Sequence, residues 1–411
     1  MNSRDKSVQL FERASKVIPG GTYGHLSPAS GLPRHFAHFC KSGSGVTFED
    51  VDGVEWLDFM CAYGAVLHGY NHERIENAVG EQRRYGTVFN HPHEVTVRLA
   101  EKLTSLIDFA SWTVFAKNGS DLTTWAIRVA REYTNRSLVL KVKGAYHGVD
   151  AWCDPGIGGR VNSDRADIIE FEWNDLNSLQ DLLAGKRDKV AAVIMTPYHH
   201  PSFAPSVMPD DDYWINVQKM CNEYGVILVL DDVRAGWRIN GKGSHCAFGF
   251  EPDLSVYSKA LGNGYAISAC VGRQELKNAA SDVFLTGSCW NDSIAMRAAL
   301  ESITIAEEEK VTQNVKNKGK YFCQELENLA TDFGYKLKMT GPYSMPYPWF
   351  EADKNLFLIQ RFCKFATMHG LFFHPYHNWF ISNAHSESTL NLALSKSRMA
   401  FEAMSEQVGE V

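Results

Sequence analysis

The chain has 411 residues, 45% hydrophobic and 22% charged, which is the composition of an ordinary globular protein with room for two or three domains. The net charge of −7 argues against a nucleic-acid binder, because that class neutralises phosphates with an excess of Lys and Arg. No apolar run approaches the roughly 20 residues that span a bilayer, residues 1–20 lack the apolar core of a signal peptide, and the nine cysteines form no C-x-x-C pair, so we expect a cytoplasmic protein without a disulfide framework or structural zinc.

The first segment with clear architecture is a strand, a polar turn and a helix between residues 113 and 133. Residues 113–116 are strand-like, residues 117–121 (KNGSD) predict a turn, and residues 126–133 repeat apolar side chains at helical spacing. The start of such a helix presents free N–H groups and the positive end of the helix dipole, which favours an anion. A simple helix cap explains this segment equally well when it is taken alone.

The second segment predicts a strand–helix–strand unit between residues 190 and 232. The runs 190–195 (VAAVIM) and 226–230 (VILVL) are continuous and apolar, as in strands that are buried on both faces of a parallel sheet. A helical pattern between them begins near Asp211 or Asp212 and ends at Gly225. Ligands of such sheets bind beyond the carboxyl ends of the strands, where Asp231 lies.

The third segment, residues 253–272, contains a lysine between two apolar runs. Residues 254–257 predict a strand, Lys259 follows in a loop with two glycines, and residues 266–271 return to apolar side chains. A lone lysine in such a loop is usually a solvated surface residue. Lys259 indicates a functional site only in combination with the anion-binding turn and the strand-end Asp231 of the two preceding segments.

Together the three segments provide the parts that a pyridoxal 5′-phosphate (PLP) enzyme needs. A lysine amine forms a Schiff base with the PLP aldehyde, a carboxylate keeps the pyridine nitrogen protonated, and N–H groups hold the phosphate. Lys259 and Asp231, 28 residues apart, match the first two parts, and the turn at Gly119 matches the third.

Other ligands are less consistent with the sequence. A run that ends in two aspartates also resembles a Walker B strand, but no G-x-x-x-x-G-K-[ST] loop is present. The segment 43–45 (GSG) lacks the third glycine of a dinucleotide fingerprint. The histidine pairs at 91 and 93 and at 199 and 200 have no carboxylate or thiol at a fixed spacing, so we expect no metal site.

At this level of detail the chain resembles the class III aminotransferases of PLP fold type I, and within them the glutamate-1-semialdehyde 2,1-aminomutase branch. The resemblance follows the family's order along nearly the whole chain. The segments that carry it are 18–21 (IPGG), 48–59 (FEDVDGVEWLDF), 115–131 (FAKNGSDLTTWAIRVAR), 143–148 (KGAYHG), 226–238 (VILVLDDVRAGWR), 257–264 (YSKALGNG) and 384–394 (AHSESTLNLAL).

The resemblance implies a role for each matching residue. Lys259 corresponds to the Schiff-base lysine, which also moves the substrate proton, and Asp231 corresponds to the partner of the pyridine nitrogen. The other cofactor contacts that it implies are Asn118, Gly119 and Ser120 around the phosphate, Tyr146 and Val233 on the two faces of the ring, and His147 in the Tyr-His segment. Ser288 corresponds to a threonine that reaches the phosphate of the neighbouring subunit, which implies a homodimer with shared active sites.

The pattern departs from the family at the substrate positions. Thr196-Pro197 replaces a Glu-Pro pair. The Asn or Gln that contacts the phenolic oxygen of PLP in the family has no clear counterpart, and His199 or His200 lies nearest to its position. Residues 290–293 (WNDS) replace a Ser-Gly-Asn-Pro segment, and both arginines that bind substrate carboxylates in the family lack a counterpart. Substrate contacts are therefore expected from an aromatic and polar set that suits a bulky or hydroxylated compound: Tyr23, His25, Tyr63, Arg234 and Trp290.

Arg234 is the least certain member of that set. It either anchors a substrate anion or polyol, or it forms a salt bridge with Asp232.

The resulting prediction is an α/β protein of PLP fold type I. It has a large PLP-binding domain (65–305) around a mostly parallel seven-stranded sheet, and a small α+β domain from both termini (1–64 and 306–411). The predicted activity is transfer of an amino group from an amine donor to a ketone or aldehyde. An aminomutase or amino acid epimerase on the same scaffold, and a non-catalytic PLP-binding regulator, are the alternatives.

Overall fold

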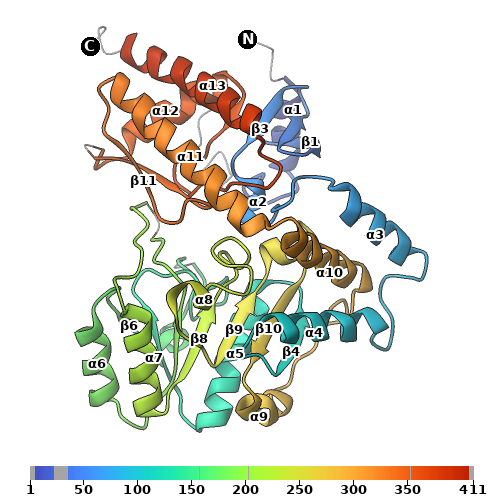
Figure 1. Ribbon diagram of the computed structural model, residues 1–411, viewed down its shortest axis with the longest axis vertical. Helices are drawn as coiled ribbons and strands as arrows, with labels where there is room; N and C mark the ends of the chain where they lie inside the picture. The colour runs from blue at the N-terminus through green and yellow to red at the C-terminus, as the bar shows by residue number, and fades with distance from the viewer. Residues whose placement is uncertain (1–4, 23–35, 157, 202, 352, 407–411) are drawn as a thin grey trace. The chain divides into compact units, whose positions relative to one another are not determined.

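The computed structural model describes residues 5–22, 36–156, 158–201, 203–351 and 353–406, which form two compact units (Figure 1). Unit 1 combines residues 1–72, 202–205 and 314–411, and unit 2 comprises residues 73–201 and 206–313. The sequence predicts boundaries after residues 64 and 305, whereas the units divide after His72 and Gln313. Most of the predicted site residues belong to unit 2.

Unit 2 is built on a seven-stranded sheet with the order β4-β10-β9-β8-β7-β5-β6. β10 is antiparallel to both of its neighbours, and the remaining pairs are parallel. The predicted mostly parallel α/β fold is therefore confirmed. The strands are β4 Trp112–Ala116, β5 Leu138–Val142, β6 Ile168–Phe171, β7 Val190–Met195, β8 Ile227–Asp231, β9 Leu254–Tyr257 and β10 Ser268–Gly272.

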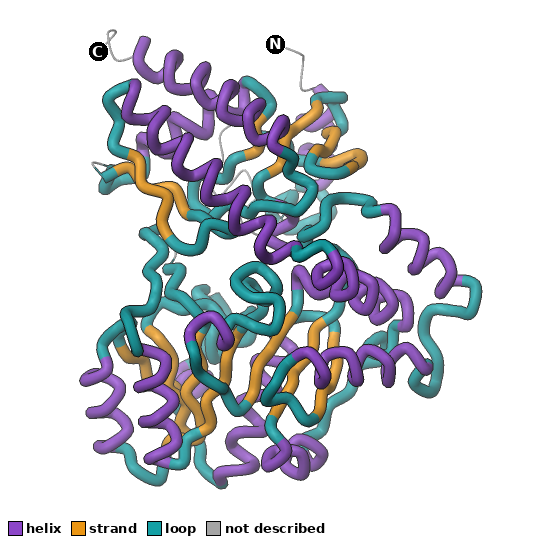
Figure 2. Tube along the Cα trace, in the orientation of Figure 1, coloured by secondary structure: helices purple, strands orange, loops and turns teal. Residues whose placement is uncertain are grey.

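Helices cover both faces of this sheet (Figures 1 and 2). α5 (Gly119–Thr134) and α9 (Lys277–Asp282) pack on one face, and α6 (Leu176–Gly185) and α7 (Tyr213–Tyr224) pack on the other. None of the helices in the described ranges is long and apolar enough to cross a bilayer. The other helical segments of unit 2 are α3 Glu73–Arg83, α4 Glu94–Leu106, η3 Asn162–Arg165, α8 His245–Phe248, η4 Lys259–Gly262, η5 Gln274–Leu276 and α10 Ser293–Glu308.

The alternation of side chains along β8 explains where its end points. Every residue of β8 is buried, as predicted for a continuous apolar run. Val229 belongs to the core beneath α5, whereas Leu228 and Leu230 belong to the core beneath α6 and α7. Because successive side chains of a strand point to opposite faces, Asp231 shares the face of Val229 and Asp232 shares the other.

Unit 1 joins the two ends of the chain in one sheet with the order β1-β2-β3-β13. Most of segment 48–59, one of those that carry the family resemblance, lies in the antiparallel pair of β2 and β3, and β13 adds to β3 in parallel. α11 begins in unit 2 and continues into unit 1. The elements are α1 Asp5–Ala14, β1 Cys40–Ser44, β2 Thr47–Asp50, β3 Glu55–Asp58, α2 Cys61–Gly64, α11 Val311–Asp332, β11 Leu337–Thr340, β12 Tyr347–Phe350, α12 Phe357–Met368, β13 Leu371–Phe372 and α13 Glu387–Glu406.

Candidate active site

Asp231 ends β8 as a buried carboxylate that other groups hold in place. Asp231 is only 5% exposed. Its Oδ2 atom lies 2.8 Å from Nδ1 of His147, and its Oδ1 atom accepts a hydrogen bond of 3.2 Å from the backbone N–H of Val233. These bonds offset the cost of burying the group. A carboxylate has about four lone-pair positions, so Asp231 retains the capacity to accept a further hydrogen bond.

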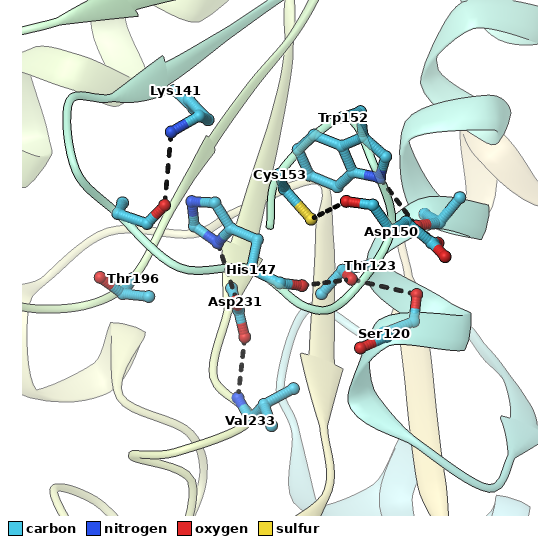
Figure 3. A network of polar contacts seen from close by, with 12 residues as sticks. Ser120, Thr123, Lys141, His147, Asp150, Trp152, Cys153, Thr196, Asp231 and Val233 are labelled. Carbon is cyan, nitrogen blue, oxygen red and sulfur yellow. Dashed lines mark hydrogen bonds and ion pairs between the residues drawn. The ribbon is translucent and has the colours of Figure 1, made fainter. Parts of the chain in front are cut away.

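His147 lies in the loop after β5 and links Asp231 to α5 (Figure 3). The hydroxyl of Thr123, near the start of α5, donates to the backbone carbonyl of His147 over 2.7 Å. Because a carboxylate only accepts, Nδ1 of His147 carries the proton that faces Asp231. Within the described residues, its buried Nε2 atom has no hydrogen-bond partner. The imidazole is stacked parallel to Trp152 at 6.2 Å, which fixes its plane.

The predicted anion site is the N-terminus of α5. Asn118 is the N-cap residue in extended conformation, and Gly119 and Ser120 are the first helical residues. The Asp121 carboxylate accepts a hydrogen bond of 2.9 Å from the backbone N–H of Asn118. The first N–H groups of a helix lack partners within the helix, so this turn offers donors to an anion.

The α5 turn packs directly against the loop that follows Asp231. A Cβ atom on Gly119 would lie 2.8 Å from Cγ2 of Val233, closer than side chains approach. Only glycine therefore allows this contact without a shift of Val233. On the other flank, Ser120 Oγ accepts a hydrogen bond of 3.1 Å from the backbone N–H of Val149, just after the Tyr-His segment. Three motifs that are distant in the sequence thus meet at the start of α5.

Lys259 occupies a strained position after β9. Its φ angle of 46° is left-handed, a conformation that costs a non-glycine residue about 1 to 3 kcal/mol. The surrounding turn compensates, since Ser302 on α10 donates to the Ala260 carbonyl over 3.1 Å. The pKa of Lys259 is lowered to about 7, chiefly by burial and next by the positive charge of Arg234, while Asp231 opposes the shift and Arg238 adds a smaller lowering. Lys259 therefore lies in the field of Asp231, as the predicted constellation requires.

Arg234 belongs to the same cluster. It hydrogen-bonds with the hydroxyl of Tyr198, whose ring is 5.3 Å from that of His200. Burial and the charges of Arg234 and Lys259 hold the pKa of His200 well below its ordinary value. By contrast, His199 stacks on Trp173 at 5.9 Å. Of the two histidines, His200 is the one close to Lys259.

Asp232 does not pair with Arg234. Within the described part of the chain its carboxylate is held by Ser244, whose N–H and hydroxyl donate over 2.8 and 2.5 Å. Burial raises the pKa of Asp232 to about 7, and the neighbouring Asp231 contributes to the rise. The suggested Arg234–Asp232 salt bridge is not among the ion pairs of the described residues, because the Asp232 carboxylate is turned toward Ser244 and Arg234 interacts with Tyr198.

The remaining predicted residues are placed differently. Tyr146 is 40% exposed, and burial of the rest of its ring, followed by the charges of Cys153 and Asp231, raises its pKa. Ser288 is exposed and Trp290 is partly buried against the core beneath α5. Tyr63 belongs to unit 1, where its ring lies 5.2 Å from that of His377. Tyr23 and His25 fall outside the described residues.

Two features of the site had no clear signal in the sequence. Tyr198 as the partner of Arg234 is one, and an ion pair of 2.6 Å between Lys117 and Asp292 is the other. The only hint of the pair was that Asp292 stands in the segment that departs from the family. Across the described ranges, no three His, Cys, Asp or Glu side chains come together in a way that could hold a metal ion.

Comparisons with known proteins agree with this geometry. The family description "Aminotransferase class-III" matches residues 31–384. The chain is 37% identical to an aminopentol aminotransferase of Sphingopyxis macrogoltabida, over 98% of this chain and 96% of that protein. It is 35% identical to a 3-aminobutyryl-CoA aminotransferase of Cloacimonas acidaminovorans (strain Evry), over 99% and 97% of the two chains.

A solved structure shows the same architecture. The PLP internal aldimine form of the FumI protein from Sphingopyxis sp. MTA144 superposes with a TM-score of 0.97 at 37% identity, covering 99% of this chain and 98% of that one. Sequence and fold therefore agree over essentially the whole length. The chain belongs to the class III aminotransferases and is a PLP-dependent aminotransferase of fold type I.

Proposed function

We propose that Lys259 and Asp231 are the catalytic residues of this aminotransferase, and that it acts on amines that carry no free carboxylate beside the amino group. The observation that carries the first part is the shared electrostatic environment of Lys259 and Asp231, with Asp231 locked by His147. The second part rests on the substrate positions and on the names of two relatives.

The residues present fit PLP. Asp231 has both oxygens oriented by neighbours and still has lone pairs for a ring nitrogen. The start of α5 supplies N–H groups for the phosphate, and the Ser120 hydroxyl lies at the same turn. Val233, which touches Gly119, and the half-exposed Tyr146 supply an aliphatic and an aromatic surface for the two ring faces. We assign Asn118 and His147 to the same cofactor site.

When bound, PLP supplies an aldehyde carbon that amines attack and a ring that accepts the electron pair left by a departing proton. Lys259 supplies an amine whose pKa of about 7 leaves much of it deprotonated at neutral pH, so it can attack that carbon. The free amine of Lys259 would also be a base of suitable strength to move a proton on the substrate carbon.

Asp231 keeps a proton on the pyridine nitrogen. Its negative charge favours the protonated ring, and the hydrogen bond from His147 Nδ1 fixes the direction in which the carboxylate points. The charge of Arg234 acts on both His200 and Lys259, so we propose that His200 and Arg234 contact oxygen substituents of cofactor or substrate.

The substrate class follows from what the chain lacks and from what its relatives are named for. Residues 24–27 and 362–397 contain no arginine, so the carboxylate clamps of the family have no counterpart there. An aminopentol and a 3-aminobutyryl thioester both carry an amine without a carboxylate next to it. We therefore place the substrates of this chain among amines of that kind, with hydroxyl groups or an acyl chain. Arg234, Trp290, Tyr63, Tyr23 and His25 are the proposed contacts.

We further propose that the enzyme is a homodimer in which Ser288 reaches the phosphate of the second copy. Ser288 is exposed, as a residue that reaches out of its own subunit must be. Large apolar side chains are exposed on the same unit, which is typical of surfaces that another chain covers. They are Tyr85, Val88, Phe89 and Phe284.

The cytoplasm is the proposed compartment. All nine cysteines are free thiols, and most of them are buried as ordinary small hydrophobic residues. Free thiols persist where the glutathione and thioredoxin systems keep proteins reduced.

Chemical trapping tests the assignment of Lys259. The protein is incubated with PLP, reduced with borohydride and digested, and the labelled peptide is identified by mass spectrometry. We expect one pyridoxyl group, on Lys259, and none in the Lys259→Ala variant, whose turnover falls on the order of 10⁴-fold. Lys143→Ala, in the Tyr-His segment, should keep the label. A label on any other lysine contradicts the proposal.

A panel of amino donors tests the substrate class. Amines with and without an adjacent carboxylate are compared through the absorbance change of bound cofactor and through the keto product released in a single turnover. We expect kcat/KM to favour donors without the carboxylate. A preference for α-amino acids as donors, together with a preference for α-keto acids as acceptors, contradicts the substrate class. An isomer of the donor as the product would indicate a mutase or epimerase.

A further inference from the structure

The segment 283–292, here called the Ser288 loop, is fastened to α5 at its beginning. The indole Nε1 of Trp125 donates to the Val283 carbonyl over 3.2 Å, and Arg128 donates to the Phe284 carbonyl over 3.3 Å. Trp125 and Arg128 lie three residues apart, on one side of α5. The same helix that begins at the phosphate turn, residues 118–120, therefore holds the start of the loop.

The far end of the loop is fastened to the residue that precedes the phosphate turn. Asp292 Oδ2 lies 2.6 Å from Nζ of Lys117, and both side chains are about four-fifths buried, at 18% and 20% exposed. The other oxygen of Asp292 caps α10 by accepting from the backbone N–H of Ile294 at 3.0 Å. One carboxylate thus joins the loop, the start of α10 and the phosphate turn.

Between these two attachments the loop is tight at its base and exposed at its tip. A Cβ atom on Gly287 would lie 2.3 Å from the indole of Trp290, so the turn is closed by a ring that covers its own glycine. The backbone N–H of Trp290 donates to the Gly287 carbonyl over 2.9 Å. Ser288 and Cys289 protrude into solvent. A tip whose one end is held on α5 and whose other end is held beside the phosphate turn has little freedom to move independently of that turn.

We propose that Lys117 and Asp292 form a positioning pair that fixes the Ser288 loop relative to the phosphate turn. The inference rests on the proposed function, in which the turn binds the subunit's own phosphate and Ser288 binds the phosphate of a second copy. Lys117, α5 and the loop then form one rigid body that carries the contacts to both phosphates. The pair lies beside the phosphate turn, so the effect that we propose for it is on cofactor binding.

The burial of the pair distinguishes it from the surface ion pairs of this protein. Exposed pairs contribute little because water screens them. A charge-assisted hydrogen bond that is largely withdrawn from water is stronger, and breaking it frees the loop to lose the orientation that Ser288 needs. Loss of this interaction should weaken PLP binding by roughly tenfold, the factor that about 1.4 kcal/mol represents.

Three variants of the intact chain separate the ion pair from its structural side effects. Asp292→Asn keeps an N-cap side chain for α10 but loses the charge, and Lys117→Met keeps the aliphatic stem. Lys102→Met is the matched control, because Lys102 forms an ion pair with Glu307 at the opposite end of α10. Affinity is measured by titrating apoenzyme with PLP, with thermal unfolding in parallel. We expect weaker binding in the first two variants and unchanged binding in the third.

A double-mutant cycle with Ser288→Ala identifies the route of the effect. If the pair acts by positioning Ser288, Asp292→Asn costs little affinity once Ser288 is already lost, so the double variant resembles Ser288→Ala alone. Additive losses would show that the pair acts independently of Ser288 and would overturn the inference. So would wild-type affinity in both Lys117→Met and Asp292→Asn. A wild-type protein that binds no PLP would instead refute the proposed function itself.

Discussion

The two ends of the parallel sheet in unit 2 both gather positive charge, yet they differ in what that charge serves. At the carboxyl end, Lys259 and Arg234 surround the buried carboxylate of Asp231 next to the start of α5. At the amino end a cavity of about 620 Å³ is lined largely by cations and by the residues that follow α5. The residues that line it are Arg131, Asn135, Arg136, Ser137, Leu138, Lys186, Asp188 and Lys189.

Hydrogen bonding explains two of the cations at the amino end, Arg136 and Arg131. Arg136 Nη1 donates to three backbone carbonyls, at 3.2 Å to Val190 and at 3.0 Å to both Tyr224 and Gly225. Arg131 Nε donates to the Ser137 carbonyl over 2.9 Å. These acceptors lie at or near the ends of α5 and α7, where carbonyls lack partners and the helix dipole is negative. The guanidinium groups of Arg131 and Arg136 therefore bind the protein's own backbone carbonyls.

Helix polarity therefore decides which cluster of charge becomes a site. In a parallel sheet with helical crossovers, each helix begins near the carboxyl end of the preceding strand and ends near the amino end of the next one. N–H groups and the positive ends of dipoles thus collect at the end where Asp231 lies. A phosphate-bearing cofactor therefore suits the carboxyl end. Among the described residues, the cavity at the amino end has several cations but lacks the helix N-termini that bind a phosphate.

The largest effect should come from Asp231, which tests whether the carboxyl end depends on this one charge. Asp231→Asn keeps the shape of the side chain but removes the charge that we propose would hold a proton on the ring nitrogen. We expect kcat to fall by roughly 10²- to 10³-fold, as for other lost electrostatic contacts to a reacting system. Single-turnover absorbance kinetics measure the loss.

The adjacent carboxyl group is the control for that variant. Asp232→Asn changes the neighbouring residue, which is buried on the opposite face and bound by Ser244. Its kcat should stay within a few-fold of wild type. Equal losses in the two variants would show that β8 needs both carboxylates for folding and would remove the special role of Asp231.

The local patterns of the sequence were sufficient to predict the elements that form this end of the sheet. The apolar runs around residues 190–195 and 226–230 became β7 and β8, and the helix between them ends at Gly225 as expected. Continuous apolar runs require burial on both faces, so they also predict a mostly parallel sheet. Because ligands bind beyond strand ends in such sheets, the positions of Asp231 and Lys259 along the chain already placed them near one another.

Contacts between distant side chains were not predictable from those patterns. The choice of His200 over His199 depends on which ring is close enough to Lys259 to feel its charge, and the partner of Arg234 depends on where Tyr198 and Ser244 lie in the folded chain. Likewise, three consecutive left-handed residues, Cys61, Ala62 and Tyr63, interrupt the short helix α2 in unit 1. Such backbone strain is imposed by the surroundings, here by hydrogen bonds of Asp58 to Met60 and Cys61.

The second effect in size concerns His147, which links Asp231 to α5. Phenylalanine at this position fills the space but cannot donate to Asp231, whereas asparagine offers an amide N–H close to the position of Nδ1. We expect His147→Phe to lower kcat by about ten- to a hundredfold, through a misdirected carboxylate. His147→Asn should recover most of the activity. If the two variants are equally impaired, packing against Trp152 and not the hydrogen bond is what matters.

The third effect is a shift in pH dependence caused by Arg234. If Lys259 is the Schiff-base lysine, as proposed above, its deprotonated form reacts with the aldehyde, so the rate at which apoenzyme recombines with PLP should rise with pH around the pKa of about 7. Burial is the main cause of that low value and Arg234 the next, and removing a cation makes the protonated lysine less unfavourable. Arg234→Met should therefore move the midpoint upward by up to roughly one unit, which corresponds to about 1.4 kcal/mol.

Stopped-flow recombination from pH 6 to 9 measures this midpoint for the wild type and the variant. Because PLP itself titrates in this range, only the difference between the two proteins is interpreted. Arg273→Met, which removes a cation paired with Glu251 near the start of β9, is the control and should leave the midpoint unchanged. An unmoved or lowered midpoint in Arg234→Met would contradict the placement of Arg234 beside Lys259.

The smallest effect on activity should come from the amino end of the sheet. Arg136→Met removes the donor that serves the carbonyls of Val190, Tyr224 and Gly225, so the free energy of unfolding should fall by about 1.5 kcal/mol. PLP affinity and kcat should remain those of the wild type, because no part of the predicted site touches that cavity. Thermal unfolding and PLP titration of the same sample measure both quantities. A loss of PLP affinity without a loss of stability would mean that the amino-end cations act on the cofactor site, and the division of the sheet into a structural end and a chemical end would fail.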